Sequence, residues 1–145
     1  LKISENKEIT SQLDGETLVF SGKVKKFNPY DWLQERTLVI TNHAIYNFNY
    51  SSLQRKIFIK SLKGITKSTA TEAGEFVIHC QSEYDYRMKA EPNRDEIINV
   101  IKFVFHSLKK VNLPIYGVKQ AKLGDFASSK NLIASGYGLI FIIGK

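Results

Sequence analysis

Apolar and polar residues alternate along the first half of the chain and beyond, as they do in strands that bury one face. In the first run, Phe20 and Val24 fall on one side, whereas Lys23 and Lys25 fall on the other. The run stops before Pro29, because proline has no backbone N–H to donate to a neighbouring strand. The pattern predicts a half-buried strand that ends in a loop.

Six further runs of the same kind follow, separated by short segments of turn-forming residues. Short turns connect antiparallel neighbours, so consecutive runs should pair as a meander that is closed or nearly closed on itself. The expected strands lie at residues 16–26, 36–41, 44–48, 55–61, 65–69, 75–80 and 84–89.

The period changes after Asn93, where apolar residues recur at the spacing of an amphipathic helix. Asn93 is placed to cap the first turn, with Glu96 in the capping-box position, and Asn112 and Pro114 end the helix. We expect the helix to cover an open end or seam of the barrel. Its apolar stripe consists of Ile97, Ile98, Val100, Ile101, Val104, Phe105 and Leu108.

These elements predict a mainly β (α+β) fold: a seven-stranded antiparallel barrel closed by one C-terminal α-helix, with a C-terminal extension. We divide the chain into an N-terminal arm at 1–14, the barrel domain at 15–111 and the extension at 112–145. The segment 137–144 is almost wholly apolar and too short to span a bilayer. We expect it to pair with a sheet edge or dock in a groove of its own domain, or else to contact a second copy or a neighbouring segment.

The net charge and the cysteine count indicate which binding partners and which cellular compartment to expect. Twenty-one Lys and Arg against 14 Asp and Glu give a net charge of +7, which favours anionic partners. The single cysteine, Cys80, allows no internal disulfide and is expected to pack as a small apolar residue in a reducing compartment. No apolar stretch is long enough to span a membrane, and no secretory leader is visible.

Particular residues resemble the pleckstrin-homology (PH) family, whose fold has the same order of seven strands and one helix. Gly22, Val24 and Lys26 match the family's G-x-L-x-K first strand. Arg36 matches the arginine of its second strand, where Gln34 stands in place of the usual basic residue.

Longer runs are similar to the PH-like lipid-binding tail domain of class I myosins and to PH domains associated with protist protein kinases. The resemblance covers about residues 15–110, and the matching runs are RTLVITNHAIYNF, RKIFIKSLKGITKSTATEAGEFVIHC and EYDYR. It implies a non-catalytic module that binds anionic phospholipid or phosphoinositide headgroups and targets a larger signalling or motor protein to membranes. The alternative is a protein-interaction or autoinhibitory module of a protein kinase with little lipid affinity.

The resemblance also implies a binding site between the first two hairpins. Lys26 and Arg36 are carried over from the family, and the charge that is missing at Gln34 predicts weak binding driven by charge. A solvated basic rim without a ligand is the alternative. The candidate ligand-binding residues are Lys23, Lys25, Lys26, Arg36, Arg55 and Lys56.

Two aromatic residues flank the expected first loop. Tyr30 has polar neighbours and is our candidate for insertion into a membrane interface, whereas Trp32 is expected to pack at the loop base. His79 is expected to be an ordinary surface or edge residue.

Catalytic and metal-binding signatures are absent from the sequence, so we expect no catalytic residue, no metal and no cofactor. Nucleic acid is disfavoured as a partner, because the basic residues are dispersed and no aromatic RNA-binding motif is present. We expect a cytoplasmic protein with peripheral membrane association, and the sequence leaves the oligomeric state open.

Overall fold

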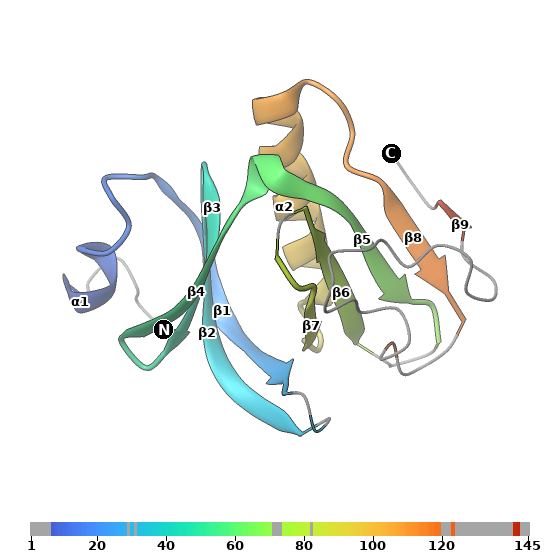
Figure 1. Cartoon of the computed structure of the whole chain (residues 1–145), viewed down its shortest axis with the longest axis horizontal. Helices are drawn as coiled ribbons and strands as arrows, with labels where there is room; N and C mark the ends of the chain where they lie inside the picture. Colours follow the sequence, from blue (N-terminus) through green and yellow to red (C-terminus); the bar gives the residue numbers. More distant parts are fainter. Residues whose placement is uncertain are drawn as a thin grey trace.

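The computed structural model describes residues 7–28, 30, 32–70, 74–81, 83–119 and 123, together with the backbone of 141–142 (Figure 1). The expected seven strands and the following helix are all present in the predicted order. The elements are α1 (Lys7–Thr10), β1 (Leu18–Phe27), β2 (Leu33–Thr41), β3 (Ala44–Asn49), β4 (Ser52–Phe58), the 3-10 helix η2 (Ile59–Ser61), β5 (Leu62–Ser68), β6 (Glu75–Cys80), β7 (Tyr86–Lys89), α2 (Arg94–Lys109), β8 (Ile115–Val118) and β9 (Phe141–Ile142).

The strands form one curved sheet in the order β4-β3-β2-β1-β7-β6-β5-β8-β9. Strands β1 to β4 and strands β5 to β7 make two antiparallel groups, and only two residue pairs, Lys25 with Lys89 and Lys26 with Met88, join β1 to β7. In Figure 1, α2 lies between the two groups. The sheet ends at β4 and β9, so the barrel of the prediction is an open one.

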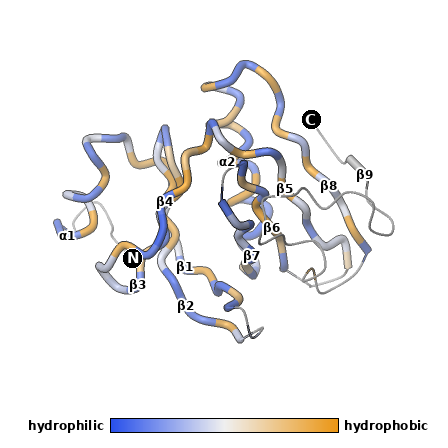
Figure 2. Tube along the Cα trace, in the orientation of Figure 1, coloured by the Kyte–Doolittle hydropathy of each residue, from blue (hydrophilic) through white to orange (hydrophobic). Residues whose placement is uncertain are grey.

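The main core lies on the inner face of the sheet and under α2. It contains alternate residues of each strand, such as Val24 of β1 and Ile78 of β6, together with Ile97, Ile101 and Phe105 of α2. Hydrophobic and hydrophilic residues alternate along the strands in Figure 2, as expected for strands with one inward face. The predicted covering role of the helix is therefore confirmed.

A second core joins the N-terminal arm to the outer face of the first hairpins. Ile9 and Leu13 of the arm are buried against Val39, Tyr46 and Phe48. This explains why the end of β2 and nearly all of β3 are buried on both faces, whereas simple alternation predicts one exposed face. The described part of the arm thus packs as part of the folded domain.

The start of α2 corrects one sequence-based prediction. Asn93 is the residue before the helix, as predicted, but its side chain makes no capping hydrogen bond. The helix ends at Lys110 in the left-handed conformation, whose N–H donates to the carbonyl of His106. None of the described helices has the length and hydropathy of a membrane-spanning segment.

The extension contributes a strand that the sequence patterns did not reveal. Strand β8 pairs with β5 in parallel, and a Cβ atom on Gly64 of β5 would lie 3.0 Å from the Tyr116 ring, so a larger residue would push β8 away. Strand β9 pairs with β8 through Phe141 and Ile142. The predicted pairing of segment 137–144 with a sheet edge is confirmed for these two residues, and the rest of that segment lies outside the described residues.

The outer face of β6 is also buried, which makes the prediction for His79 wrong. His79 has no exposed surface, and its Nδ1 lies 2.8 Å from the Asp85 carboxylate while its Nε2 lies 2.6 Å from the Thr66 hydroxyl. Alternation could not reveal this, because residues far away in sequence contact the outer face: the amide of the fully buried Leu123 donates to the carboxylate of Glu75 on β6 at 2.9 Å. Cys80 packs in the inner core as expected, and burial raises the pKa of its thiol to about 12.

Candidate functional site

Three of the predicted cations lie close together on the inner face of the sheet, one on each of β1, β2 and β4. Lys26 shares a face of β1 with the buried Val24, and Arg36 of β2 lies directly opposite Val24. Arg55 of β4 reaches the same face, because it is paired with Asn47 of β3. We call the three side chains of Lys26, Arg36 and Arg55 the inner basic cluster.

The charges in the inner basic cluster act on one another. Lys26 is half-buried, and its pKa is lowered by burial and then by the positive charges of Arg36 and Arg55. A lowered lysine pKa means that the surroundings disfavour the charged ammonium. An anion placed among the three side chains would reverse that effect.

Arg55 is the most deeply placed member of the cluster. Its Nη2 donates to the carbonyl of Tyr84, and its guanidinium carbon lies 3.9 Å from the centre of the Tyr84 ring. Its Nε lies 3.5 Å from the Glu83 carboxylate without the alignment of a hydrogen bond. Arg55 is thus held in position by Tyr84, while its Nε and Nη1 have no hydrogen-bond acceptor in the protein.

Buried polar atoms without a partner in the protein gather at this cluster. They include Nε of Arg36, Nε and Nη1 of Arg55, the hydroxyl of Tyr86 and the amide oxygen of Asn47. Burial raises the pKa of the Tyr86 hydroxyl, which therefore stays protonated and able to donate. Buried donors are nearly always paired in native structures, with protein, water or a ligand, so a concentration of donors without a protein partner is a candidate ligand site.

The tip of the β1–β2 hairpin lies beyond the cluster and is aromatic. The Asn28 side-chain oxygen accepts hydrogen bonds from the amides of Tyr30 (2.8 Å) and Trp32 (3.0 Å). Both aromatic side chains are exposed, with exposed fractions of 79% for Tyr30 and 71% for Trp32. The expected packing of Trp32 at the loop base is therefore wrong, whereas Tyr30 is exposed as expected.

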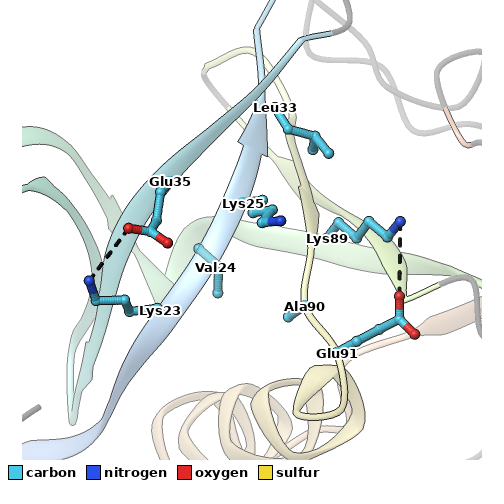
Figure 3. Close-up of a pocket in the computed structure, with 8 residues that line it drawn as sticks. All are labelled: Lys23, Val24, Lys25, Leu33, Glu35, Lys89, Ala90 and Glu91. Carbon is cyan, nitrogen blue, oxygen red and sulfur yellow. Dashed lines mark hydrogen bonds and ion pairs between the residues drawn. The ribbon is translucent and has the colours of Figure 1, made fainter.

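Lys23 and Lys25 lie on the opposite, outer face of the same hairpin. Lys23 is 3.5 Å from the Glu35 carboxylate, and both side chains are exposed. Figure 3 shows a pocket on this face, between the hairpin and the end of β7, with a volume of about 240 Å³. Its lining residues are Lys23, Val24, Lys25, Leu33, Glu35, Lys89, Ala90 and Glu91.

Lys56 is separated from both faces of the first hairpin. It lies beside the N-terminal arm, 3.0 Å from the Asp14 carboxylate and 3.6 Å from that of Glu16. The Tyr46 hydroxyl bond, followed by the nearby carboxylates, raises the pKa of Lys56 despite some burial. The structure thus divides the six candidate cations into three groups.

Sequence reasoning missed three residues of these sites. Asn47 and Tyr86 lie at the inner basic cluster, and Lys89 lines the outer pocket. Alternation indicates that Tyr86 points inward, but it cannot indicate that the hydroxyl lacks a partner. In the part of the chain that the structure describes, no three His, Cys, Asp or Glu side chains are grouped as a metal site.

Comparison with known sequences identifies one family. The model of the family described as unconventional myosin tail, actin- and lipid-binding, matches residues 1–122, which is most of the chain. No curated protein matches the chain significantly.

Comparison with solved structures identifies PH domains. The C-terminal PH domain of pleckstrin, solved with D-myo-Ins(1,2,3,5,6)P5, is 15% identical with a TM-score of 0.54, over 62% of this chain and 97% of that one. The Slm1 PH domain, solved with inositol 4-phosphate, is 13% identical with a TM-score of 0.53, over 61% and 96%. A DH/PH fragment of PDZRHOGEF, solved with human RhoA, is 12% identical with a TM-score of 0.58, over 68% of this chain but only 31% of the fragment. At these identities the likeness shows the fold alone, and it confirms the PH-like fold.

Proposed function

The chain belongs to the unconventional myosin tail family, and from that premise we propose that it is a non-catalytic module that binds the phosphorylated headgroup of an anionic phospholipid. The proposed ligand site is the inner basic cluster. Peripheral attachment of a larger protein to a membrane would follow from that binding.

The gathering of unpaired buried donors is the observation that carries this proposal. Arg36 and Arg55 together leave three guanidinium nitrogens without a hydrogen-bond partner in the protein, although one of them, Nε of Arg55, lies 3.5 Å from the Glu83 carboxylate. Leaving buried donors unpaired costs about 1–3 kcal/mol each, so a fold retains such a group most readily where a ligand supplies the acceptors. A phosphate has three acceptor oxygens and negative charge, and it therefore suits a cluster made only of donors.

Each member of the cluster has a distinct role in this proposal. Arg36 and Arg55 supply planar guanidinium donors, which can contact two phosphate oxygens at once. Lys26 supplies a point charge at the rim, and a bound anion would oppose the burial and the neighbouring positive charges that lower its pKa. Asn47 adds an acceptor and Tyr86 a donor, and both suit the hydroxyl groups of a sugar-like headgroup better than they suit a bare ion.

The aromatic tip supports the membrane as the source of that headgroup. Tyr30 and Trp32 are exposed, their backbone amides both donate to the Asn28 side chain, and their ring centres lie 6.5 Å apart. Tyrosine and tryptophan favour the interface between lipid headgroups and hydrocarbon. Insertion of this tip would bring the adjoining ends of β1 and β2 to the depth of the headgroup phosphates.

Vesicle sedimentation tests the proposal. Lys26→Gln/Arg36→Gln should bind phosphatidylcholine vesicles that contain phosphatidylinositol 4,5-bisphosphate roughly 30-fold more weakly than the parent, from about 1 kcal/mol per basic residue. The matched control is Lys60→Gln/Lys109→Gln, which removes two exposed lysines from η2 and the end of α2. Equal binding by the two double variants would show that the inner basic cluster is not the headgroup site.

A second candidate function is binding to actin, the other activity in the family's description. Phe103 of α2 is 70% exposed and lines a mainly apolar groove of about 490 Å³ with Val19, Val100, Asn99 and Glu96. An exposed aromatic side chain in such a groove is typical of a residue that anchors a protein interface. Phe103→Ser should reduce cosedimentation with actin filaments and leave vesicle binding unchanged. Unchanged cosedimentation would remove this groove from consideration.

A further inference from the structure

One acidic side chain lies at the inner basic cluster, and it belongs to the connection between β6 and β7. The Glu83 carboxylate is 3.5 Å from Nε of Arg55. Among the residues that the structure describes, no other carboxylate lies within ion-pair distance of Lys26, Arg36 or Arg55. Glu83 thus stands beside the cations where an anionic oxygen of a ligand would stand.

The contact between Glu83 and Arg55 is incomplete. Charge-assisted bonds between a guanidinium and a carboxylate are usually about 2.7–2.9 Å long and often come as a parallel pair. Here the single contact is longer, and both Nε and Nη1 of Arg55 remain without a hydrogen-bond acceptor in the protein. Glu83 therefore supplies counter-charge to the cluster but leaves these donors of Arg55 unsatisfied.

Arg55 is held in place by contacts that do not involve the Glu83 side chain. The Tyr84 carbonyl accepts from Nη2 of Arg55, and the Tyr84 ring lies 3.9 Å from the guanidinium carbon. The Arg55 side chain is only 6% exposed, whereas that of Glu83 is 43% exposed and makes no other ion pair among the described residues. Rotation of the Glu83 side chain into solvent would thus open the cluster and leave Arg55 in position.

We propose that Glu83 is an intramolecular competitor for the inner basic cluster, which a phosphate group displaces when it binds Arg55. The inference rests on the proposed function, because it takes the cluster as a site for phosphate. Whichever anion enters, the displaced carboxylate loses the same attraction to Arg55. That loss lowers the affinity for every anionic ligand by the same factor.

A competitor of this kind favours a headgroup on a membrane over a phosphate in solution. A soluble phosphate has only the contacts of the cluster with which to displace Glu83. A headgroup in an anionic bilayer adds the attraction of neighbouring lipids for basic residues and the insertion of the exposed Tyr30 and Trp32. Glu83 therefore disfavours occupation of the site by soluble phosphates until the hairpin tip meets a membrane.

Competition differs from simple repulsion in how its effect depends on the ligand. A carboxylate that leaves the site costs the same for each ligand, since the same contact is broken. A carboxylate that stayed would repel each ligand in proportion to the charge of that ligand. Inorganic phosphate and inositol 1,4,5-trisphosphate carry different charges, so a comparison between them separates the two effects.

Titrations of the whole chain with these two ligands, followed by the 1H–15N NMR signal of Arg55 Nε, make that comparison. Glu83→Gln should bind both ligands about fivefold more tightly than the parent, the factor expected when one partly exposed ion pair no longer has to be broken. Glu91→Gln is the matched control, because the Glu91 side chain is 45% exposed and lies 3.9 Å from Lys89 at the outer pocket. It removes the same charge and should leave both affinities unchanged.

Three results would overturn the proposal. The first is equal binding by Glu83→Gln and Glu91→Gln, and the second is a gain in Glu83→Gln that is larger for the trisphosphate than for phosphate. The third is the absence of a saturable shift at Arg55 with either ligand.

These results are independent of the vesicle test of the proposed function. If Lys26→Gln/Arg36→Gln loses vesicle binding but the two glutamate variants give the same titration at Arg55, the proposed function stands and the competitor role of Glu83 is refuted. If the vesicle test fails but Glu83→Gln still lowers both dissociation constants by one factor, Glu83 competes with soluble anions and the membrane role of the cluster is refuted.

Discussion

Among the described residues, buried polar groups on the outer face of β5 to β7 are hydrogen-bonded, whereas those around the inner basic cluster include atoms without a hydrogen-bond partner. In β5 to β7, His79 is bonded on both ring nitrogens, and Glu75 is bonded to Arg87. In β1 to β4 and on the inward side of β7, the buried donors of Arg36, Arg55 and Tyr86 include atoms without a partner in the protein. The first arrangement contributes to stability, and the second is the ligand site that we propose. Substitutions in the two regions should therefore have opposite effects on folding and on binding.

The largest effect is expected at the buried ion pair on the outer face of β5 to β7. Glu75→Ala removes the carboxylate that accepts from Arg87 Nε at 3.2 Å and from the amide of Leu123. Loss of one partner of a buried pair costs about 3–5 kcal/mol, because the remaining charge stays buried. Urea unfolding should show this loss, whereas Glu35→Gln, in an exposed pair, should change stability by less than about 1 kcal/mol. Similar midpoints for the two variants would contradict the structural role given to Glu75.

The next largest effect is expected at Asp85. The Asp85 carboxylate lies 2.8 Å from His79 Nδ1 and accepts a hydrogen bond from the amide of Cys80 at 3.2 Å. Asp85→Ala would leave both of these buried groups without that partner. We expect a loss of about 2–3 kcal/mol from these buried groups, measured by urea unfolding. Vesicle binding at a temperature where the variant remains folded should match that of the parent. A variant that binds vesicles poorly while folded would place Asp85 in the binding site instead.

A smaller effect of opposite sign is expected at the inner basic cluster. Tyr86→Phe removes a buried hydroxyl that has no partner, so the free energy of unfolding should stay the same or rise by up to about 1 kcal/mol. Binding of vesicles that contain phosphatidylinositol 4,5-bisphosphate should weaken, because the ligand loses a donor. Tyr84→Phe is the matched control, since Tyr84 is half exposed and offers Arg55 its carbonyl and its ring. A clear loss of stability in Tyr86→Phe would mean that its hydroxyl has a structural role.

The inner basic cluster was predictable in part from the sequence, and its members show where that reasoning stops. A period of two places Lys26 on the inner face with Val24, and the family pattern indicates Arg36. The same period places Arg55 on the face of the buried Ile57 and Lys56 on the other face. It cannot show that Arg55 meets Lys26 and Arg36, because this depends on the register between β3 and β4, which shifts between Asn47 and Phe48. Strand register is set by packing across the sheet and is not a property of one strand's sequence.

The outright errors have a common physical cause. His79 was expected near the surface and Trp32 in the core, and each lies in the opposite environment. In both cases partners outside the local pattern take part: the amide of Leu123 donates to Glu75 on the outer face of β6, and the amide of Trp32 donates to the Asn28 side chain. The seven strands and α2 were predictable because their patterns are long and local, unlike the parallel strand β8.

The smallest effect is expected in the pH dependence of stability that arises from the Lys26 ammonium. It tests whether the inner basic cluster disfavours positive charge until an anion binds. Burial and then the neighbouring arginines lower the pKa of Lys26 in the folded state, so between that lowered pKa and the unfolded value the unfolded chain binds more protons. Stability should therefore rise with pH across this alkaline window, and Lys26→Met should lose that part of the rise. NMR detection of the Lys26 side chain should show its pKa moving upward when inositol phosphate is added, because the anion stabilises the ammonium. Lys60 is the internal control, and an equal upward shift at both lysines would mean that the anion acts through general charge screening and not through the inner basic cluster.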